Sequence, residues 1–230
     1  MHYVFVDEKY LEDGEHKTII VAAWAVNQNT LNNNLEQLSL PERAPFLQRV
    51  EAAFKILNAV AFIGRAQLPK SVFRNGETDG CDDIPAMART DTVWSLATAF
   101  AVGRLLLDVA QSGQLMDVAD LHFDPKSLKE AHLVAWEKTL RSLLVQEARR
   151  FASQAGLRSL EDIRIRHIRF VEKAKNSDPD KFQQGVALAD SLCSWSEEIF
   201  NSNLSRISHA DMSDVVERTV SQWDGVPFYR

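Results

Sequence analysis

The chain has 230 residues, of which 45% are hydrophobic and 25% are charged, as in an ordinary globular protein. Its formal net charge of −6 argues against a protein that coats nucleic acid through bulk positive charge, although one local basic patch can still bind it. The sequence shows no signal peptide and no uninterrupted apolar run that reaches the roughly 18 residues of a membrane span. We therefore expect a cytoplasmic protein without a membrane partner, with Cys81 and Cys193 as free thiols.

The first segment that points to a function is residues 2–8. Residues 2–6 are rich in β-branched and aromatic side chains and predict a short strand, which runs directly into Asp7 and Glu8. A carboxylate beside a buried strand is costly unless a metal or a basic group meets it. Ligands of open α/β sheets bind outside the carboxyl ends of the strands, so Asp7 is the first candidate site residue.

In the first half of the chain, turn residues at 11–15 predict that the apolar run 16–26 forms a hairpin with the first strand. A helix is expected over 41–53 and a third strand within 55–68. Residues 69–89 are loop-like and hold three aspartates without a regular calcium-ligand spacing. A solvated loop is therefore favoured over a calcium site there.

In the second half, residues 91–112 are apolar nearly all round and predict a buried helix that Thr90 caps. Residues 118–124 alternate in polarity and predict a strand that again ends on an aspartate, Asp124. A capping box at 127–130 begins a helix to about 155, and the arginines of a strand at 163–171 favour an edge position. The last two predicted segments are the amphipathic helices 181–200 and 210–223.

This order predicts an α/β fold with a mixed five-stranded sheet flanked by helices. Three antiparallel strands followed by parallel strands are typical of the ribonuclease H-like fold, in which the first and fourth strands are parallel neighbours. Here these two strands end on Asp7 and Asp124. The third carboxylate of that fold comes from the last helix, where Asp190 lies beside the apolar stripe. We expect a domain over 1–200 with a helical insert at about 41–54, and a helical extension at 201–230.

Three carboxylates around one pocket repel each other unless cations neutralise them, and their hard oxygen atoms suit Mg²⁺ or Mn²⁺. Two such ions about 4 Å apart can activate water and stabilise the leaving oxygen of a phosphodiester. Asp7, Asp124 and Asp190 are thus the predicted metal ligands and catalytic residues of a nuclease-like hydrolase that acts on nucleic acid. The sequence contains no nucleophile elbow, Gly-rich phosphate loop or zinc spacing that would favour other chemistry.

The segments YVFVDE and VALAD resemble the two end motifs of domain of unknown function family 3800. The resemblance spans residues 1 to about 200, and it implies a ribonuclease H-like fold and a nuclease role. The chain departs from the family pattern in three places. Lys9 replaces a serine, Ala187 replaces a glutamine, and residues 172–177 match a loop motif only loosely. These departures leave open a non-catalytic binding or regulatory protein on the same fold.

Several other residues have an ordinary structural interpretation beside a functional one. Asp124 precedes a proline in a common turn, and Asp91 suits a helix N-terminus. If the first strand continues, Glu8 points to the opposite sheet face, as a surface residue or an accessory ligand. A lone strand histidine such as His122 is more often structural. Lys173 and Lys175 fit a solvated loop. Six arginines fit a local basic patch and a solvated surface about equally well. They are Arg141, Arg149, Arg150, Arg164, Arg166 and Arg169.

Overall fold

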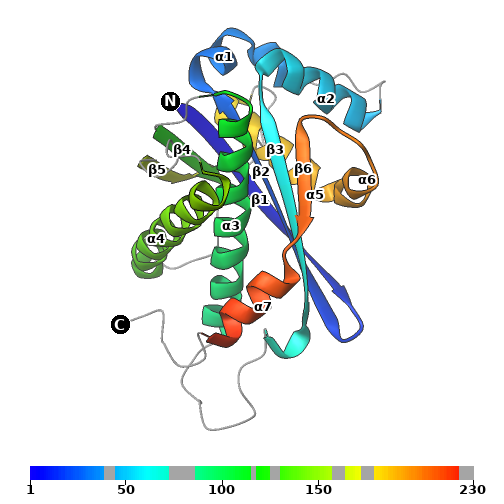
Figure 1. Ribbon diagram of the computed structural model, residues 1–230. Helices are drawn as coiled ribbons and strands as arrows, with labels where there is room; N and C mark the ends of the chain where they lie inside the picture. The colour runs from blue at the N-terminus through cyan, green and yellow to red at the C-terminus, as the bar shows by residue number, and fades with distance from the viewer. Residues whose placement is uncertain are drawn as a thin grey trace.

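The computed structural model describes residues 1–38, 45–72, 86–114, 118–124, 130–156, 164–171 and 179–222, and its centre is a sheet with helices on both faces (Figure 1). The strands are β1 His2–Asp13, β2 His16–Asn27, β3 Val60–Pro69, β4 Val118–Phe123, β5 Arg164–Phe170 and β6 Ile207–Asp211. The α-helices are α1 Gln28–Asn33, α2 Phe46–Leu57, α3 Ala86–Gln111, α4 Glu130–Ala155, α5 Lys181–Ser194, α6 Ser196–Phe200 and α7 Ser213–Gln222. Two short 3₁₀ helices are η1 Leu35–Leu38 and η2 Lys70–Val72.

The sheet has the strand order β5-β4-β1-β2-β3-β6. The pairs β1–β2 and β2–β3 are antiparallel, whereas β4 is parallel to β1 and β5 is parallel to β4. The predicted α/β class is therefore confirmed, together with its antiparallel half and its parallel half. The expected parallel pairing of the first and fourth strands is also confirmed.

The prediction of five strands is wrong, because β6 adds a sixth strand parallel to β3 at one edge. β6 has five residues, of which Ile207 is buried, so its apolar signal is too short to stand out in the sequence. The helix expected at 210–223 consequently starts later. The carboxylate of Asp211 accepts a hydrogen bond from the main-chain N–H of Ser213 at 2.9 Å, and α7 begins there.

The first strand is longer than predicted, because β1 pairs with β2 along its whole length, from His2 opposite Asn27 to Asp13 opposite His16. Its pairing with β4 stops earlier, at Val6 opposite Phe123. Asp7 is therefore not the end of a strand. It lies where β1 loses its neighbour on the β4 side.

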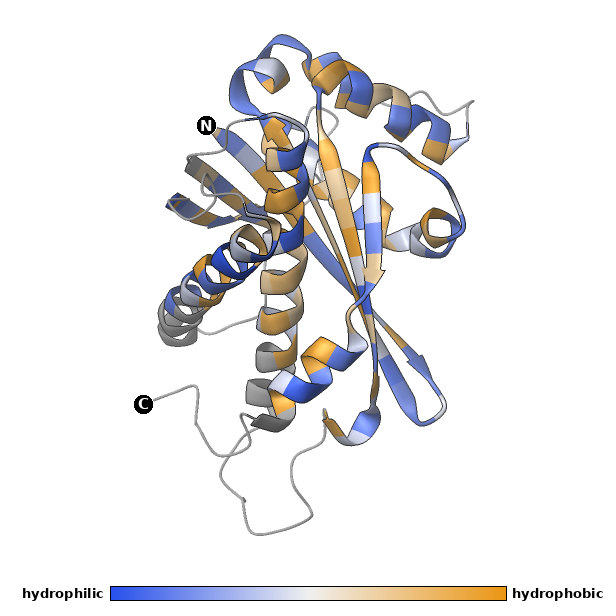
Figure 2. Ribbon diagram, in the orientation of Figure 1, coloured by the Kyte–Doolittle hydropathy of each residue, from blue (hydrophilic) through white to orange (hydrophobic). Residues whose placement is uncertain are grey.

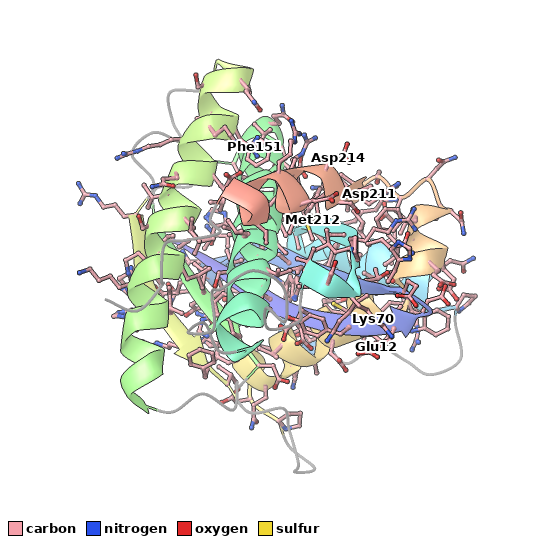
Figure 3. All side chains as sticks on the ribbon, turned by 90° about the horizontal axis from the view of Figure 1, so that it is seen from below. Glu12, Lys70, Phe151, Asp211, Met212 and Asp214 are labelled. Carbon is pink, nitrogen blue, oxygen red and sulfur yellow. The ribbon has the colours of Figure 1, made fainter. Side chains whose placement is uncertain are left out.

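The far end of this hairpin is fixed to the end of β3. Gly14 turns the chain with a φ of +51°, and the main-chain N–H of Lys70 donates to the carbonyl of Glu15 at 2.9 Å. The ammonium of Lys70 lies 3.5 Å from the carboxylate of Glu12, and Figure 3 shows these two side chains together. The extension beyond Asp7 is thus held at its tip as well as by its own pairing.

The helix predicted over 181–200 is divided at Trp195 into α5 and α6. The boundaries of α3 and α2 also differ from prediction. α3 begins at Ala86 and not after Thr90, since the preceding residues continue the helix rather than capping it. α2 begins at Phe46 and runs to Leu57, where Asn58 ends it in the left-handed conformation with a φ of 48°. The loop aspartates at 79, 82 and 83 and the thiol of Cys81 lie outside the described residues, whereas Cys193 is a free, buried thiol as expected.

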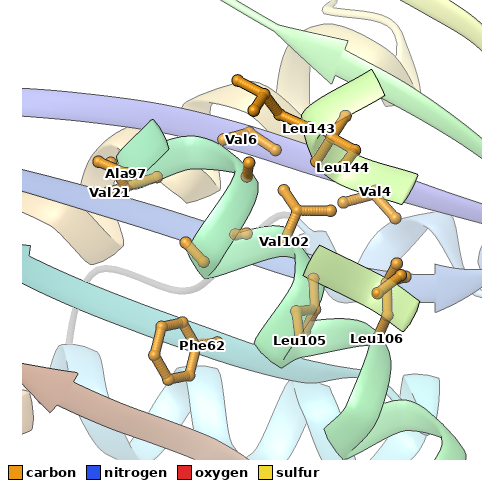
Figure 4. Close-up of a cluster of buried hydrophobic side chains, with 14 of the residues drawn as sticks. Val4, Val6, Val21, Phe62, Ala97, Val102, Leu105, Leu106, Leu143 and Leu144 are labelled. Carbon is orange, nitrogen blue, oxygen red and sulfur yellow. The ribbon is translucent and has the colours of Figure 1, made fainter. Parts of the chain in front are cut away.

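One core lies between the sheet and the helices α3, α4 and α7 (Figure 4). Val4 and Val6 of β1 face this core, and Figure 2 shows that α3 is hydrophobic over most of its described length. The stretch Val93–Gln111 is long and apolar enough to cross a membrane, but 72% of it is buried inside the protein. Its apolar surface is thus covered by the sheet and by α4, which confirms the predicted buried helix.

A second core lies on the other face, under α1, α2, α5 and α6. Its centre is the stacked pair of Phe5 and Trp24, with ring centroids 4.7 Å apart. The indole N–H of Trp24 donates to the carbonyl of Gly185 at 2.9 Å. A Cβ atom at Gly185 would lie 2.3 Å from the Phe5 ring, so only glycine lets α5 approach β1 this closely.

Candidate functional site

The alternation of β1 determines which side of the sheet Asp7 faces. Val4 and Val6 belong to the core under α3, whereas Tyr3 and Phe5 belong to the core under α5. Successive side chains of a strand point to opposite faces, so Asp7 follows Phe5 on the α5 side. Asp7 is only 2% exposed there.

Asp124 lies on that side of the sheet for the same reason. Leu121 and Phe123 of β4 face the α3 core, and the buried His122 between them contacts rings of the opposite core. Asp124 lies two residues after His122, so it points to the same face of the sheet as His122. Because Val6 opposite Phe123 is the last pair of the two strands, Asp7 and Asp124 follow it at the same level of the sheet.

The helix α5 brings Asp190 to this region. The thiol of Cys193 donates to the main-chain carbonyl of Asp7 at 3.3 Å, which places this turn of α5 directly over β1. Asp190 lies one turn before Cys193 and one turn after the buried Val186, so it shares a helix flank with both. Asp190 and Asp124 are each half-buried.

The three aspartates thus lie on one side of the sheet. Among the residues that the structure describes, no group of three or more His, Cys, Asp or Glu side chains could hold a metal ion. The carboxylate of Asp7 accepts a hydrogen bond from the main-chain N–H of Glu8 at 2.8 Å. A ligand set made of Asp7, Asp124 and Asp190 therefore stays a prediction.

An ion pair that was not predicted from the sequence lies beside this region. Asp120 is 2% exposed, and both of its carboxylate oxygens accept hydrogen bonds from the guanidinium of Arg166, at 3.2 and 3.1 Å. A bidentate arginine is a strong partner for a carboxylate and offsets much of the cost of burying it. The alternating Asp120 in one strand and Arg166 in the next were the only signal of this pair in the sequence.

His122 is enclosed by aromatic rings. Its imidazole is stacked between Phe5 and Phe182, with centroids 5.2 and 4.5 Å away, and Tyr3 meets it edge-on at 5.5 Å. Neither ring nitrogen has a hydrogen-bond partner among the described residues. Burial lowers the pKa of His122 to about 4, so the ring is neutral at pH 7. This environment fits the structural role that the sequence suggested.

The six arginines for which a basic patch was one of two interpretations are divided between two elements. On α4, Arg141 lies 2.9 Å from Glu137, and Arg150 forms an ion pair with Glu147. The arginines of β5 occupy the edge of the sheet, as predicted. Lys173 and Lys175 lie outside the described residues.

Comparisons with known proteins add little to this description. Neither the protein-family models nor the curated proteins gave a match. A chain in the structure of the PCNA:RNase HII complex from Archaeoglobus fulgidus is similar at 12% identity and a TM-score of 0.33, over 99% of this chain and 92% of that one. An identity and a TM-score this low support no conclusion about the fold or the function of this chain. What relates the protein to a known architecture is therefore the order and pairing of its own strands.

Proposed function

We propose that this chain has a ribonuclease H-like fold, belongs to domain of unknown function family 3800, and hydrolyses phosphodiester bonds of nucleic acid with Mg²⁺ or Mn²⁺. The observation that carries the proposal is the placement of Asp7 and Asp124 at one level of two parallel neighbouring strands, beneath the helix that bears Asp190. The strand order β3-β2-β1-β4-β5 supports the fold, with β6 as an addition at the edge.

The residues present fit the proposed ion in their chemistry. Asp7, Asp124 and Asp190 supply the hard oxygen atoms that Mg²⁺ and Mn²⁺ prefer, and they would hold the metal. When bound, the ion would activate a water and stabilise the leaving oxygen of the phosphodiester. Without a cation, like charges repel, so the three side chains are expected to avoid one another. A ligand set that forms only with the metal is consistent with its absence among the described residues.

The chain itself contributes rigidity at this place. The main chain of Asp7 is held by β2 on one side and by the thiol of Cys193 from above, and its carboxylate is fixed by the N–H of Glu8. The close contact of Gly185 with Phe5 fixes the height of α5 over the sheet. These contacts define where Asp7 and Asp190 lie before any ligand binds, which lowers the cost of forming a site.

A second candidate is a non-catalytic binding or regulatory protein on the same fold. Two observations favour it. No metal-holding group of three acidic, histidine or cysteine side chains occurs in the described parts of the chain. Lys9, two residues after Asp7, and Ala187, three residues before Asp190, also depart from the family motifs.

Cleavage assays test the proposed activity. Purified protein is incubated with end-labelled single- and double-stranded DNA and RNA in millimolar Mn²⁺ or in EDTA. We expect cleavage only with the metal, and a loss of at least about 100-fold in Asp7→Asn and Asp190→Asn, because each removes a negatively charged ligand. Asp13→Asn, at the exposed hairpin tip, should leave the rate unchanged. Full activity of Asp190→Asn, or cleavage of no substrate by the unchanged protein, would favour the second candidate.

A further inference from the structure

The strand β5 contains an irregularity that changes the direction of its side chains. Ala119 of β4 pairs with Ile165, but the next residue, Asp120, pairs with His167, so Arg166 is an extra residue in the ladder. Such a bulge places two successive residues of one strand opposite a single residue of its neighbour. After Arg166, the side chains of β5 therefore point to the opposite faces from those that strict alternation would give them.

Because of the bulge, the charged residues of β5 all point to one side of the sheet, away from the core under α3. Ile165 belongs to the core under α3, and Ile168 and Phe170 pack against that core. The remaining side chains are exposed, and we call them the β5 basic strip: Arg164, Arg166, His167 and Arg169. Without the bulge, the alternation that turns Ile165 inward would turn His167 and Arg169 inward too.

The strip lies on the same side of the sheet as the aspartates. Arg166 bonds to Asp120, which precedes His122 on the α5 side of β4, and Arg169 pairs with His122 in the ladder. β4 is the neighbour of both β5 and β1. The strip therefore lies one strand beyond the one that leads to Asp124.

The strip carries local positive charge on a chain whose net charge is −6. Arg166 is neutralised by Asp120, but Arg164 and Arg169 form no ion pair with any described residue. This differs from α4, where Arg141 and Arg150 each meet a glutamate. Two exposed guanidinium groups that meet no carboxylate in the described parts of the chain suit phosphate groups, which arginine binds through two parallel hydrogen bonds.

An aromatic ring and a further cation border the strip. Phe182, at the start of α5, is half-buried and stacks on His122, which is the ladder partner of Arg169. The ammonium of Lys181 lies 5.1 Å from the Phe182 ring centroid. Positive charge beside an aromatic ring is a combination with which proteins bind single-stranded nucleic acids, since the backbone follows the charges and a base stacks on the ring.

We propose that the β5 basic strip binds the sugar-phosphate backbone of a single-stranded nucleic acid and leads it toward Asp124, Asp7 and Asp190. This inference rests on the proposed function, because it names the substrate class and the approach to that same site. Arg164 and Arg169 contact phosphates. Arg166 acts differently, since it holds Asp120 and keeps the strip in place.

Binding in EDTA tests the strip separately from any cleavage. The affinity of a fluorescein-labelled oligothymidylate is measured by anisotropy over a series of salt concentrations. The variant Arg164→Ala/Arg169→Ala is compared with Lys138→Ala/Arg149→Ala, which removes two exposed cations from α4 and changes the net charge equally. We expect the strip variant to bind about tenfold more weakly at low salt, with a salt slope smaller by about 1.4. The α4 variant should bind as the unchanged protein does.

Each outcome decides the inference. Weaker binding of the strip variant alone supports it, even if no cleavage or metal binding is found, in which case only the proposed hydrolase fails. Equal binding by the two variants, or no binding by the unchanged protein at low salt, overturns it. Competition by poly-glutamate as strong as that by unlabelled oligothymidylate also overturns it, because the strip would then be a general anion surface that fits an acidic protein.

Discussion

Replacing Arg166 by alanine is expected to destabilise the protein by about 2 to 3 kcal/mol, although an exposed arginine usually contributes less than about 1 kcal/mol. The reason is its partner, since the side chain of Asp120 is only 3% exposed and would remain buried without a cation. The side chain of Arg166 is 51% exposed, so water can hydrate part of the space that it leaves. We therefore expect a smaller loss than the roughly 3 to 5 kcal/mol that breaking a fully buried ion pair costs.

Urea denaturation of Arg166→Ala and Arg164→Ala measures this effect. Arg164 is exposed on the same strand and makes no ion pair with a described residue, so its replacement should cost less than about 0.5 kcal/mol. Asp120→Asn should recover part of the loss in the Arg166→Ala background, because it removes the uncompensated charge. Equal stability of the two single variants would show that Asp120 does not depend on Arg166.

Lowering the pH from 6.5 to 4 should cost about 3 kcal/mol of stability through His122 alone. Burial lowers the folded-state pKa of His122 to about 4; Asp120 and Asp180 oppose this shift, while Arg169 and Lys181 add to it. The histidine of the unfolded chain binds its proton at about pH 6.5. Between these two values the unfolded state holds more protons, so stability falls as the pH falls and becomes level below about 4.

The variant His122→Phe tests this dependence, because a phenyl ring can occupy the stack between Phe5 and Phe182 without binding a proton. Between pH 6.5 and 4, this variant should lose about 3 kcal/mol less stability than the unchanged protein loses. His167→Gln is the control, since His167 is exposed on the neighbouring strand. If His122→Phe and the unchanged protein lose stability in parallel over this interval, His122 is not protonated on unfolding.

The fold could be predicted from sequence as far as its strands and helices carry long periodic signals. The hairpin and the buried helix α3 follow from apolar runs and turn residues. The parallel pairing of β1 with β4 was expected only from the fold that the order of the elements suggested. β6 escaped prediction because it depends on pairing with β3, a tertiary contact that five residues with one buried side chain do not reveal. The length of β1 beyond Asp7 likewise depends on β2, which supplies hydrogen bonds where the residues themselves are polar.

The candidate site could also be predicted only in part, because some of its contacts depend on tertiary structure. The proximity of Asp7 and Asp124 could be predicted, because each follows a strand and the expected order makes these two strands parallel neighbours. The pair of Asp120 and Arg166 could not be found in this way, because it depends on a bulge that a sequence pattern does not show. The burial of His122 was equally hidden, since it comes from Phe182 on a helix 60 residues further along the chain.

Calorimetric titration with Mn²⁺ of the unchanged protein and of Asp190→Asn, together with metal-free thermal melts, is the most direct test of the three-aspartate site. We predict that the unchanged protein binds Mn²⁺ and that Asp190→Asn binds it much more weakly. The metal-free variant should melt at the same temperature or higher, because one of three repelling charges is gone. Equal affinity in the two proteins, or no binding by the unchanged protein at millimolar Mn²⁺, would contradict the metal site and leave the non-catalytic function in its place.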